Sequence, residues 1–338
     1  MDHRIPVTLL TGFLGSGKTT LLNKLLSHPG MKDTAVIINE LGEAGLDHIL
    51  AQNVESSYVA DNTVLLQSGC LCCTLSNELA DTMRDLFFKR AMEAIPQFNR
   101  LVIETTGMAD PGPILGNLMN EPVIESVYRL DAVVVTIDAV YGAEQIDTHA
   151  EARKQAAVAD VLLITKTDLA TPEQTELLKE KLIALNPGAT QHRVLHGEID
   201  PDFIIDVGLF DPTGKQAEPQ RWLRAPLKSA KPRGMLSQTT HNDEISSFTV
   251  YMPKPLNWRD LKPVILKLCQ TYGEQLLRLK GIIHAEDQPA PLAIHAVHFT
   301  PYLPTLLEGW DEDEPISRVV LIGKGLDEDG IRKLLTQI

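Results

Sequence analysis

The sequence predicts an α/β fold, in which a doubly wound, mostly parallel sheet is followed by a smaller α+β domain. Apolar, β-rich runs alternate with helical stretches through the first 190 residues, an order typical of parallel sheets. A glycine-rich motif joins the first run to the first helix. Beyond about residue 208 the pattern breaks into Pro- and Gly-containing turns and then resumes in a different order.

The first strands are expected where apolar runs lack polar alternation, because a parallel sheet is covered on both faces. Such runs occupy 7–10, 35–38, 64–66, 101–103, 132–137 and 161–164. Helical spacing of apolar residues lies between them, at 18–27, 76–94, 148–159 and 172–185. The last of these helices begins with Thr171 and Pro172, a cap residue followed by proline at the first helical position.

The second domain is expected after a linker. We assign 1–207 to the first domain, 208–244 to a linker or loop region and 245–338 to the C-terminal α+β domain. The elements expected in that domain are strands at 245–252, 277–284, 292–299 and 318–322 and helices at 258–271 and 328–335. This order predicts a small sheet with helices on one face.

The charge of the chain limits its partners. With 45 acidic and 31 basic residues, the 338-residue chain has a formal net charge of -14, which argues against nucleic acid or an anionic membrane as the main partner. No apolar run approaches the roughly 18 residues that a membrane span needs. We therefore expect a cytoplasmic globular protein.

The glycine-rich motif is a phosphate-binding loop, or P-loop. Residues 12–19 read Gly-Phe-Leu-Gly-Ser-Gly-Lys-Thr, between an expected strand and an expected helix. Gly12 and Gly17 let the backbone N–H groups converge on phosphate oxygens, Lys18 reaches the β and γ phosphates and Thr19 offers its hydroxyl to Mg²⁺. The nucleotide-binding residues predicted here are Gly12, Phe13, Leu14, Gly15, Ser16, Gly17, Lys18, Thr19 and Thr20.

A second acidic group is expected opposite the Mg²⁺. Glu104 ends the apolar run at 101–103, and Gly107 follows it. We expect Glu104 to hold Mg²⁺ through water and Gly107 to sense the γ-phosphate, which makes Lys18, Thr19 and Glu104 the predicted catalytic residues. A strand-end glutamate that only meets solvent is the alternative.

The base is expected to be guanine. Thr165, Lys166 and Asp168 follow the run at 161–164, where Lys166 can pack along a purine and Asp168 can accept the N1 and N2 hydrogens of guanine. Adenine offers no matching pair of donors, so a buried carboxylate would disfavour it. The segment is similar to the Asn-Lys-x-Asp element of GTPases, with Thr165 in place of asparagine.

Three of the four cysteines, Cys70, Cys72 and Cys73, fall within four residues. Thiolates at a helix N-terminus bind soft or borderline cations, of which Zn²⁺ is the commonest and Co²⁺ or Ni²⁺ are alternatives. A redox pair or buried structural thiols are the other interpretations, and a disulfide between the adjacent Cys72 and Cys73 would be strained. The fourth, Cys269, lies in an apolar segment and is expected to be a buried core thiol.

Three thiols do not complete a tetrahedral site. Glu40 and Glu43, a histidine, water or a client group are candidates for the fourth ligand. Glu40 and Glu43 lie in the polar, glycine-containing segment 39–45, where we expect a nucleotide-sensing switch. We also expect His295 and His298 to share one face of a strand, which leaves a weak second metal site open.

These motifs together resemble the CobW-type family of metal-handling P-loop GTPases. The resemblance rests on 12–20, 39–43, 69–73, 104–111 and 165–168, and in the second domain on 277–281 and 317–323. It implies slow GTP hydrolysis, Zn²⁺ or a related metal at the three clustered cysteines, and delivery of that metal to a client metalloprotein. Metal storage is not implied, because the chain lacks a histidine-rich tract.

Our main hypothesis is therefore a GTP-driven metallochaperone with GTP, GDP and a client metalloprotein as partners. A metal-responsive GTPase switch or sensor that acts through a protein effector is the alternative, and a nucleotide kinase is a third class. A homodimer is left open. The expected cofactors are Mg²⁺ with GTP and Zn²⁺, or Co²⁺ or Ni²⁺ in its place.

Overall fold

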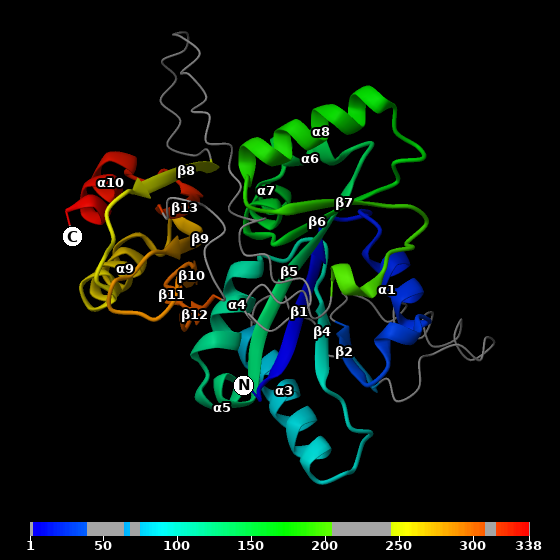
Figure 1. Cartoon of the computed structure of the whole chain (residues 1–338). Coiled ribbons are helices and arrows are strands. Elements are labelled where there is room, and N and C mark those ends of the chain that lie inside the picture. The colour runs from blue at the N-terminus through cyan, green and yellow to red at the C-terminus, as the bar shows by residue number, and fades with distance from the viewer. Residues whose placement is uncertain (1–2, 39–63, 68–74, 205–244, 308–315, 338) are drawn as a thin grey trace. The chain divides into compact units, whose positions relative to one another are not determined.

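The structure is a computed structural model that describes residues 3–38, 64–67, 75–204, 245–307 and 316–337 (Figure 1). The chain divides into two compact units. One comprises Met1–Lys181 and Gln191–Ala217, and the other comprises Leu182–Thr190 and Glu218–Ile338. The expected linker at 208–244 lies outside the described residues, so the predicted domain boundaries stay a prediction.

The first unit is built on a seven-stranded sheet in the order β3-β2-β4-β1-β5-β6-β7. Strands β1 to β6 pair in parallel. The chain order reverses on the two sides of β1, so the carboxyl end of β1 is a topological switch point, where α/β proteins bind ligands. The strands are β1 (Ile5–Gly12), β2 (Thr34–Ile38), β3 (Val64–Gln67), β4 (Arg100–Glu104), β5 (Tyr128–Asp138), β6 (Val161–Thr165) and β7 (Thr190–Val194).

Helices cover this sheet. Leu21, Leu22 and Leu25 of α1 (Lys18–Leu26) join the buried cluster formed by side chains of β1, β2, β4, β5 and β6. Helices α3, α4, α5 and α7 contact one another, and α4, α5 and α7 contact β5. The bounds are α3 (Leu75–Ala91), α4 (Pro111–Asn120), α5 (Pro122–Val127), α6 (Gly142–Thr148), α7 (Ala150–Val158) and α8 (Pro172–Leu185), with short 3₁₀ turns η1 (Pro29–Met31) and η2 (Pro201–Phe203).

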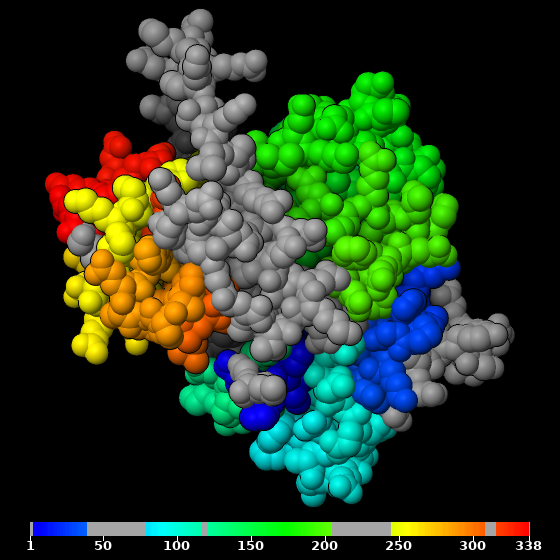
Figure 2. All heavy atoms as spheres, in the orientation of Figure 1, coloured from blue at the N-terminus to red at the C-terminus, as the bar shows by residue number. Residues whose placement is uncertain are grey.

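The outer face of α3 lies at the surface of the molecule, where its residues are cyan in the space-filling view (Figure 2). Phe88 on this helix is 55% exposed and Met92, just beyond its end, is 79% exposed. Both are isolated apolar side chains on an otherwise charged helix that carries Asp81, Asp85 and Lys89, and such single exposures are ordinary in soluble domains.

The expected doubly wound fold is confirmed, with local differences. Each of the six expected strands is present, and β5 begins four residues earlier than expected. The helix expected at 148–159 is α7, which begins after His149, whose backbone is extended (φ -116°, ψ 120°) and separates it from the unexpected α6. Helices α4 and α5 were not expected; each begins with a proline after an acidic cap, Asp110 or Glu121, whose carboxylate accepts a backbone N–H.

The second unit contains a six-stranded sheet whose main path is β11-β10-β9-β13-β8, with β12 paired to β10. The strands of this sheet pair antiparallel. The elements are β8 (Ile245–Met252), α9 (Trp258–Tyr272), β9 (Leu276–Ile283), β10 (Leu292–Val297), β11 (Thr300–Pro301), β12 (Thr305–Leu306), β13 (Ser317–Lys324) and α10 (Glu328–Thr336). Side chains of α9 and α10 share a buried cluster with those of β8, β9, β10 and β13, which confirms the expected α+β arrangement.

Among the residues that the structure describes, no helix has the length and apolar character needed to cross a membrane.

Candidate functional site

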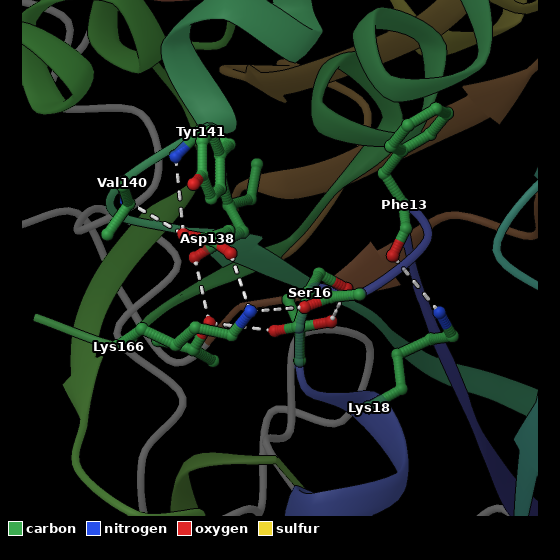
Figure 3. Close-up of polar contacts among 11 residues, drawn as sticks. Phe13, Ser16, Lys18, Asp138, Val140, Tyr141 and Lys166 are labelled. Atoms are coloured by element: carbon green, nitrogen blue, oxygen red, sulfur yellow. Dashed lines mark hydrogen bonds and ion pairs between the residues drawn. The ribbon is translucent and has the colours of Figure 1, made fainter. Parts of the chain in front are cut away.

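The P-loop connects the carboxyl end of β1 to the first residue of α1. Gly12 has φ 146° and Gly17 has φ 94°, and a Cβ at Gly12 would overlap Thr136 and Ser16. The Ser16 amide donates to Phe13 O at 3.1 Å, which closes the turn. Lys18 is 8% exposed, and its ammonium donates to Gly12 O at 2.8 Å and Phe13 O at 3.2 Å (Figure 3).

Buried hydroxyl groups tie the P-loop to the neighbouring strands. Ser16 Oγ lies 2.7 Å from Thr136 Oγ1 on β5. Thr165 Oγ1 on β6 donates to Ser16 O at 2.7 Å and is 3.2 Å from Ile137 O. On the other side, Thr105 Oγ1 donates to Thr11 Oγ1 at 2.7 Å. The loop is therefore held by the ends of strands distant in sequence, and Thr165, predicted to bind nucleotide, places its hydroxyl against the P-loop backbone.

A cavity of about 430 Å³ lies over the P-loop. It brings together residues from three predicted segments: the P-loop, the loop after β4 and the segment after β6. Its lining comprises Leu14, Gly15, Gly17, Lys18, Thr19, Thr20, Glu104, Thr105, Thr106, Gly107, Met108 and Lys166. A pocket lined by backbone amides at a helix N-terminus, with a buried lysine, suits a polyphosphate.

Thr19 and Glu104 both line this cavity, and Glu104 is only 3% exposed. A hydroxyl and a carboxylate are the hard oxygen donors that Mg²⁺ prefers, so the residues present fit that ion. Gly107 packs against the P-loop so closely that a Cβ there would lie 2.7 Å from Leu14 N. The loop that follows β4 and the P-loop are thus in direct contact, as a γ-phosphate sensor requires.

Helix α7 holds the loop after β4. The side-chain amide of Gln155, which is fully buried, donates to Gly107 O at 3.2 Å and to Ala109 O at 3.0 Å. Lys154 Nζ lies 2.6 Å from Asp110 Oδ2. At the start of α7, His149 stacks on Phe13 of the P-loop with ring centroids 4.6 Å apart. Sequence reasoning missed Gln155 and Lys154, because a Lys-Gln pair within a helix carries no motif.

The side of the site expected to hold the base contains a further carboxylate that was not predicted. Lys166 donates to Gly15 O at 2.6 Å and to Asp138 Oδ2 at 2.7 Å (Figure 3). Asp168 is exposed and lies in a turn closed by the hydrogen bond from Leu169 N to Lys166 O, and it does not line the cavity. The sequence could have indicated Asp138, because this residue ends an apolar strand beside β1 just as Glu104 does.

The expected metal ligands Cys70, Cys72, Cys73, Glu40 and Glu43 lie outside the described residues. Within the described part of the chain, no three His, Cys, Asp or Glu side chains gather closely enough to hold a metal ion.

The expected arrangement of His295 and His298 is wrong. His295 is buried within β10, whereas His298 follows the last residue of that strand with φ 49°, and its Nδ1 lies 3.0 Å from Gly273 O after α9. Side chains three positions apart on a strand point to opposite faces, so the two imidazoles do not share one.

Cys269 lies in the helix-covered core of the second unit and is fully buried. Desolvation raises the pKa of its thiol to about 12. A thiol with this pKa stays protonated at neutral pH, which confirms the expected inert core cysteine and separates it from the clustered thiols.

Comparison with known proteins gives matches over nearly the whole chain. The CobW/HypB/UreG nucleotide-binding domain matches residues 6–193, and the cobalamin synthesis protein cobW C-terminal domain matches residues 245–338. The zinc chaperone YjiA of Escherichia coli K12 is 38% identical over 97% of this chain and 96% of its own. The zinc chaperone CobW of Sinorhizobium is 27% identical over 99% and 97%. The crystal structure of Zn(II)-bound YjiA GTPase superposes with a TM-score of 0.70, covering 98% of both chains at 30% identity.

Proposed function

This chain belongs to the CobW/HypB/UreG family of P-loop GTPases, and on that premise we propose that it is a GTP-hydrolysing metallochaperone that binds Zn²⁺ through Cys70, Cys72 and Cys73 and delivers it to a client metalloprotein. The reaction is GTP and water to GDP and phosphate. The observation that carries the proposal is the match to the zinc chaperone YjiA, which extends over almost the full length of both chains.

Hydrolysis is assigned to the cavity over the P-loop. Lys18 and the amides of the loop bind the β and γ phosphates. Thr19 and Glu104 would hold Mg²⁺, which would supply positive charge against the charge that develops on the transferred phosphoryl group. Gly107 in the loop after β4 packs against Leu14, so the position of that loop can respond to the occupant of the P-loop. Lys166 and Asp168 bind the guanine.

Metal transfer is assigned to the cysteine cluster. Zn²⁺ takes four ligands in structural sites, so three thiolates leave one position for Glu40, Glu43, a histidine, water or a group of the client. A site with an exchangeable fourth ligand suits transfer of the ion. GTP can change its affinity only if GTP favours one of two arrangements of segment 39–45. GTP would then tighten the site and hydrolysis would loosen it.

A zinc titration tests this proposal. The wild-type protein is titrated under reducing conditions with a non-hydrolysable GTP analogue, with GDP and without nucleotide. We expect zinc to bind about tenfold more tightly with the GTP analogue than with GDP, a coupling of ordinary size. Equal affinity in the three states would sink the proposal.

Matched variants locate the two sites. The triple change Cys70→Ser, Cys72→Ser and Cys73→Ser should abolish tight zinc binding, whereas Cys269→Ala should leave it unchanged because that thiol is buried. Lys18→Ala should bind zinc normally without nucleotide but lose the response to GTP and reduce phosphate release by about a hundredfold or more, since a buried phosphate contact is removed. Transfer of zinc to a zinc-free client enzyme separates the chaperone from a sensor that only changes its GTP turnover.

A further inference from the structure

Lys166 is held in one position at the wall of the nucleotide cavity. It follows the last residue of β6 with a positive φ of 54°, and its ammonium contacts Gly15 O of the P-loop and Asp138 Oδ2 at 2.6 and 2.7 Å. The side chain is 37% exposed, and it lines the cavity. Two acceptors therefore fix the charged end of a side chain whose stem stays open to a ligand.

Asp138 is itself fixed by the backbone. Its side chain is 3% exposed at the carboxyl end of β5. Oδ1 accepts the amide hydrogens of Val140 at 2.8 Å and Tyr141 at 3.3 Å, while Oδ2 accepts from Lys166 (Figure 3). The two oxygens have separate tasks, and the carboxylate does not rotate without breaking contacts on both sides.

The strand pair beneath these side chains is paired up to its last residue. Asp138 is directly opposite Thr165 in the parallel register of β5 and β6. Beyond that pair, Ala139 N donates to Thr165 O at 2.9 Å, and Thr165 Oγ1 bonds the P-loop at Ser16 O. The distance from Asp138 to Lys166 is thus set by sheet hydrogen bonds, which is the preorganisation that a binding site needs.

We propose that Asp138 is a positioning residue for recognition of the purine base. Asp138 does not touch the nucleotide. It holds Lys166 so that the lysine stem lies along the base. The turn that begins at Lys166 then presents Asp168 to the N1 and N2 hydrogens of guanine. The inference rests on the proposed GTP hydrolysis and adds a residue that determines affinity for guanine nucleotides.

Asp138→Asn separates the two tasks of this side chain. The amide oxygen can still accept from Val140 and Tyr141, but the amide nitrogen then faces the Lys166 ammonium, donor against donor. We expect the Kd for GDP and GTP to rise about tenfold, because a hydrogen bond between charged groups is lost. The kcat at saturating GTP should change less than about twofold, since the γ-phosphate is bound elsewhere. Fluorescent GDP release and steady-state phosphate release measure these quantities.

A double-mutant cycle shows whether Asp138 acts through Lys166. Lys166→Met keeps the stem and removes the ammonium; adding Asp138→Asn to Lys166→Met should then change the Kd by less than about twofold. Additive effects of the two substitutions would overturn the inference. Preference for GDP over IDP, which lacks the 2-amino group, should also fall in Asp138→Asn.

Asp147→Asn is the matched control, because it breaks an exposed ion pair with Lys181 in the same unit. Its Kd for GDP should equal that of the wild type. If Asp138→Asn lowers kcat and leaves the Kd unchanged, the positioning role is refuted while the GTPase assignment stands. If the wild-type protein releases no phosphate from GTP, the proposed function itself fails.

Discussion

The carboxyl edge of the parallel sheet and the helix-covered core of the second unit bury very different side chains. Five polar residues at the sheet edge are at most 5% exposed, and the side chain of each is hydrogen-bonded to a residue distant in sequence; they are Thr11, Ser16, Thr136, Asp138 and Thr165. The second core consists mainly of Leu, Ile and Val and includes one thiol, Cys269.

The difference indicates that the apolar core mainly stabilises the fold, whereas the polar sheet edge fixes the geometry of the binding site. Apolar packing tolerates small shifts and stabilises in proportion to the area buried. A buried polar network fixes distances, at the risk that one lost partner leaves another group unsatisfied. The polar sheet edge is the part that would hold a nucleotide in one geometry. The following substitutions test whether stability and nucleotide binding depend on different regions.

Leu268→Ala in α9 should have the largest effect on stability. Leu268 is fully buried among the strands of the second sheet, so the cavity left behind should lower the free energy of unfolding by about 3 kcal/mol. Urea denaturation measures the loss. Leu266→Ala, two residues earlier and 40% exposed in the wild type, is the control, with an expected change within about 0.5 kcal/mol. GTP affinity near that of the wild type in folded Leu268→Ala would support independent roles for the two regions.

Gln155→Leu should lower the free energy of unfolding less than Leu268→Ala does, but it should lower GTP turnover more. The substitution leaves Gly107 O and Ala109 O without their side-chain donor, which should lower the free energy of unfolding by about 2 kcal/mol. Because this loop contacts the P-loop, GTP turnover should fall as well. Gln97→Leu removes an equivalent donor to Arg90 O at an exposed position, where water can replace it, and should change neither property. Equal effects of the two changes would contradict the role given to α7.

Ionisation of Cys269 should have the smallest effect on the free energy of unfolding. Its pKa is about 12 in the folded chain against 9.0 ordinarily, so well below pH 9 both states keep the proton and stability does not change. As the pH rises through 9 the unfolded state loses the proton first, so stability falls. Between pH 8 and 9.5 the wild type should lose about 0.8 kcal/mol more than Cys269→Ala, measured by denaturation at each pH. Alkylation of Cys269 by N-ethylmaleimide without denaturant would contradict its burial.

The sequence predicted those parts of the fold and site that local patterns encode. Apolar runs located β1 to β6 and the longer strands β8, β9, β10 and β13, but not β7, β11 or β12. The runs lack polar alternation because β1, β2, β4, β5 and β6 are buried on both faces. Gly12, Lys18, Glu104 and Lys166 were found because each belongs to a short motif at the end of a strand. The structure brings these motifs to one cavity, as the order of parallel strands predicts.

The remaining contacts depend on pairings that no local pattern reveals. Gln155 supports Gly107 and Ala109 across 46 to 48 residues, and Asp138 reaches Lys166 across 28. Their roles follow from which helix lies over which loop and from the register of β5 with β6. The Pro-Gly-Pro beginning of α4 reads as a turn, because the cap that starts the helix, Asp110, is recognised only from its hydrogen bond to Gly112 N.

The bond between Thr165 Oγ1 and Ser16 O, which spans 149 residues, also constrains when the protein can become functional during its synthesis. At about 5–20 residues per second, a ribosome needs roughly 7–30 s to proceed from Ser16 to Thr165. Until then the P-loop lacks the partners from β5 and β6 that hold it in shape. The nascent chain therefore acquires its nucleotide site late, and cellular GTP can stabilise the emerging domain only after β6 has left the ribosome.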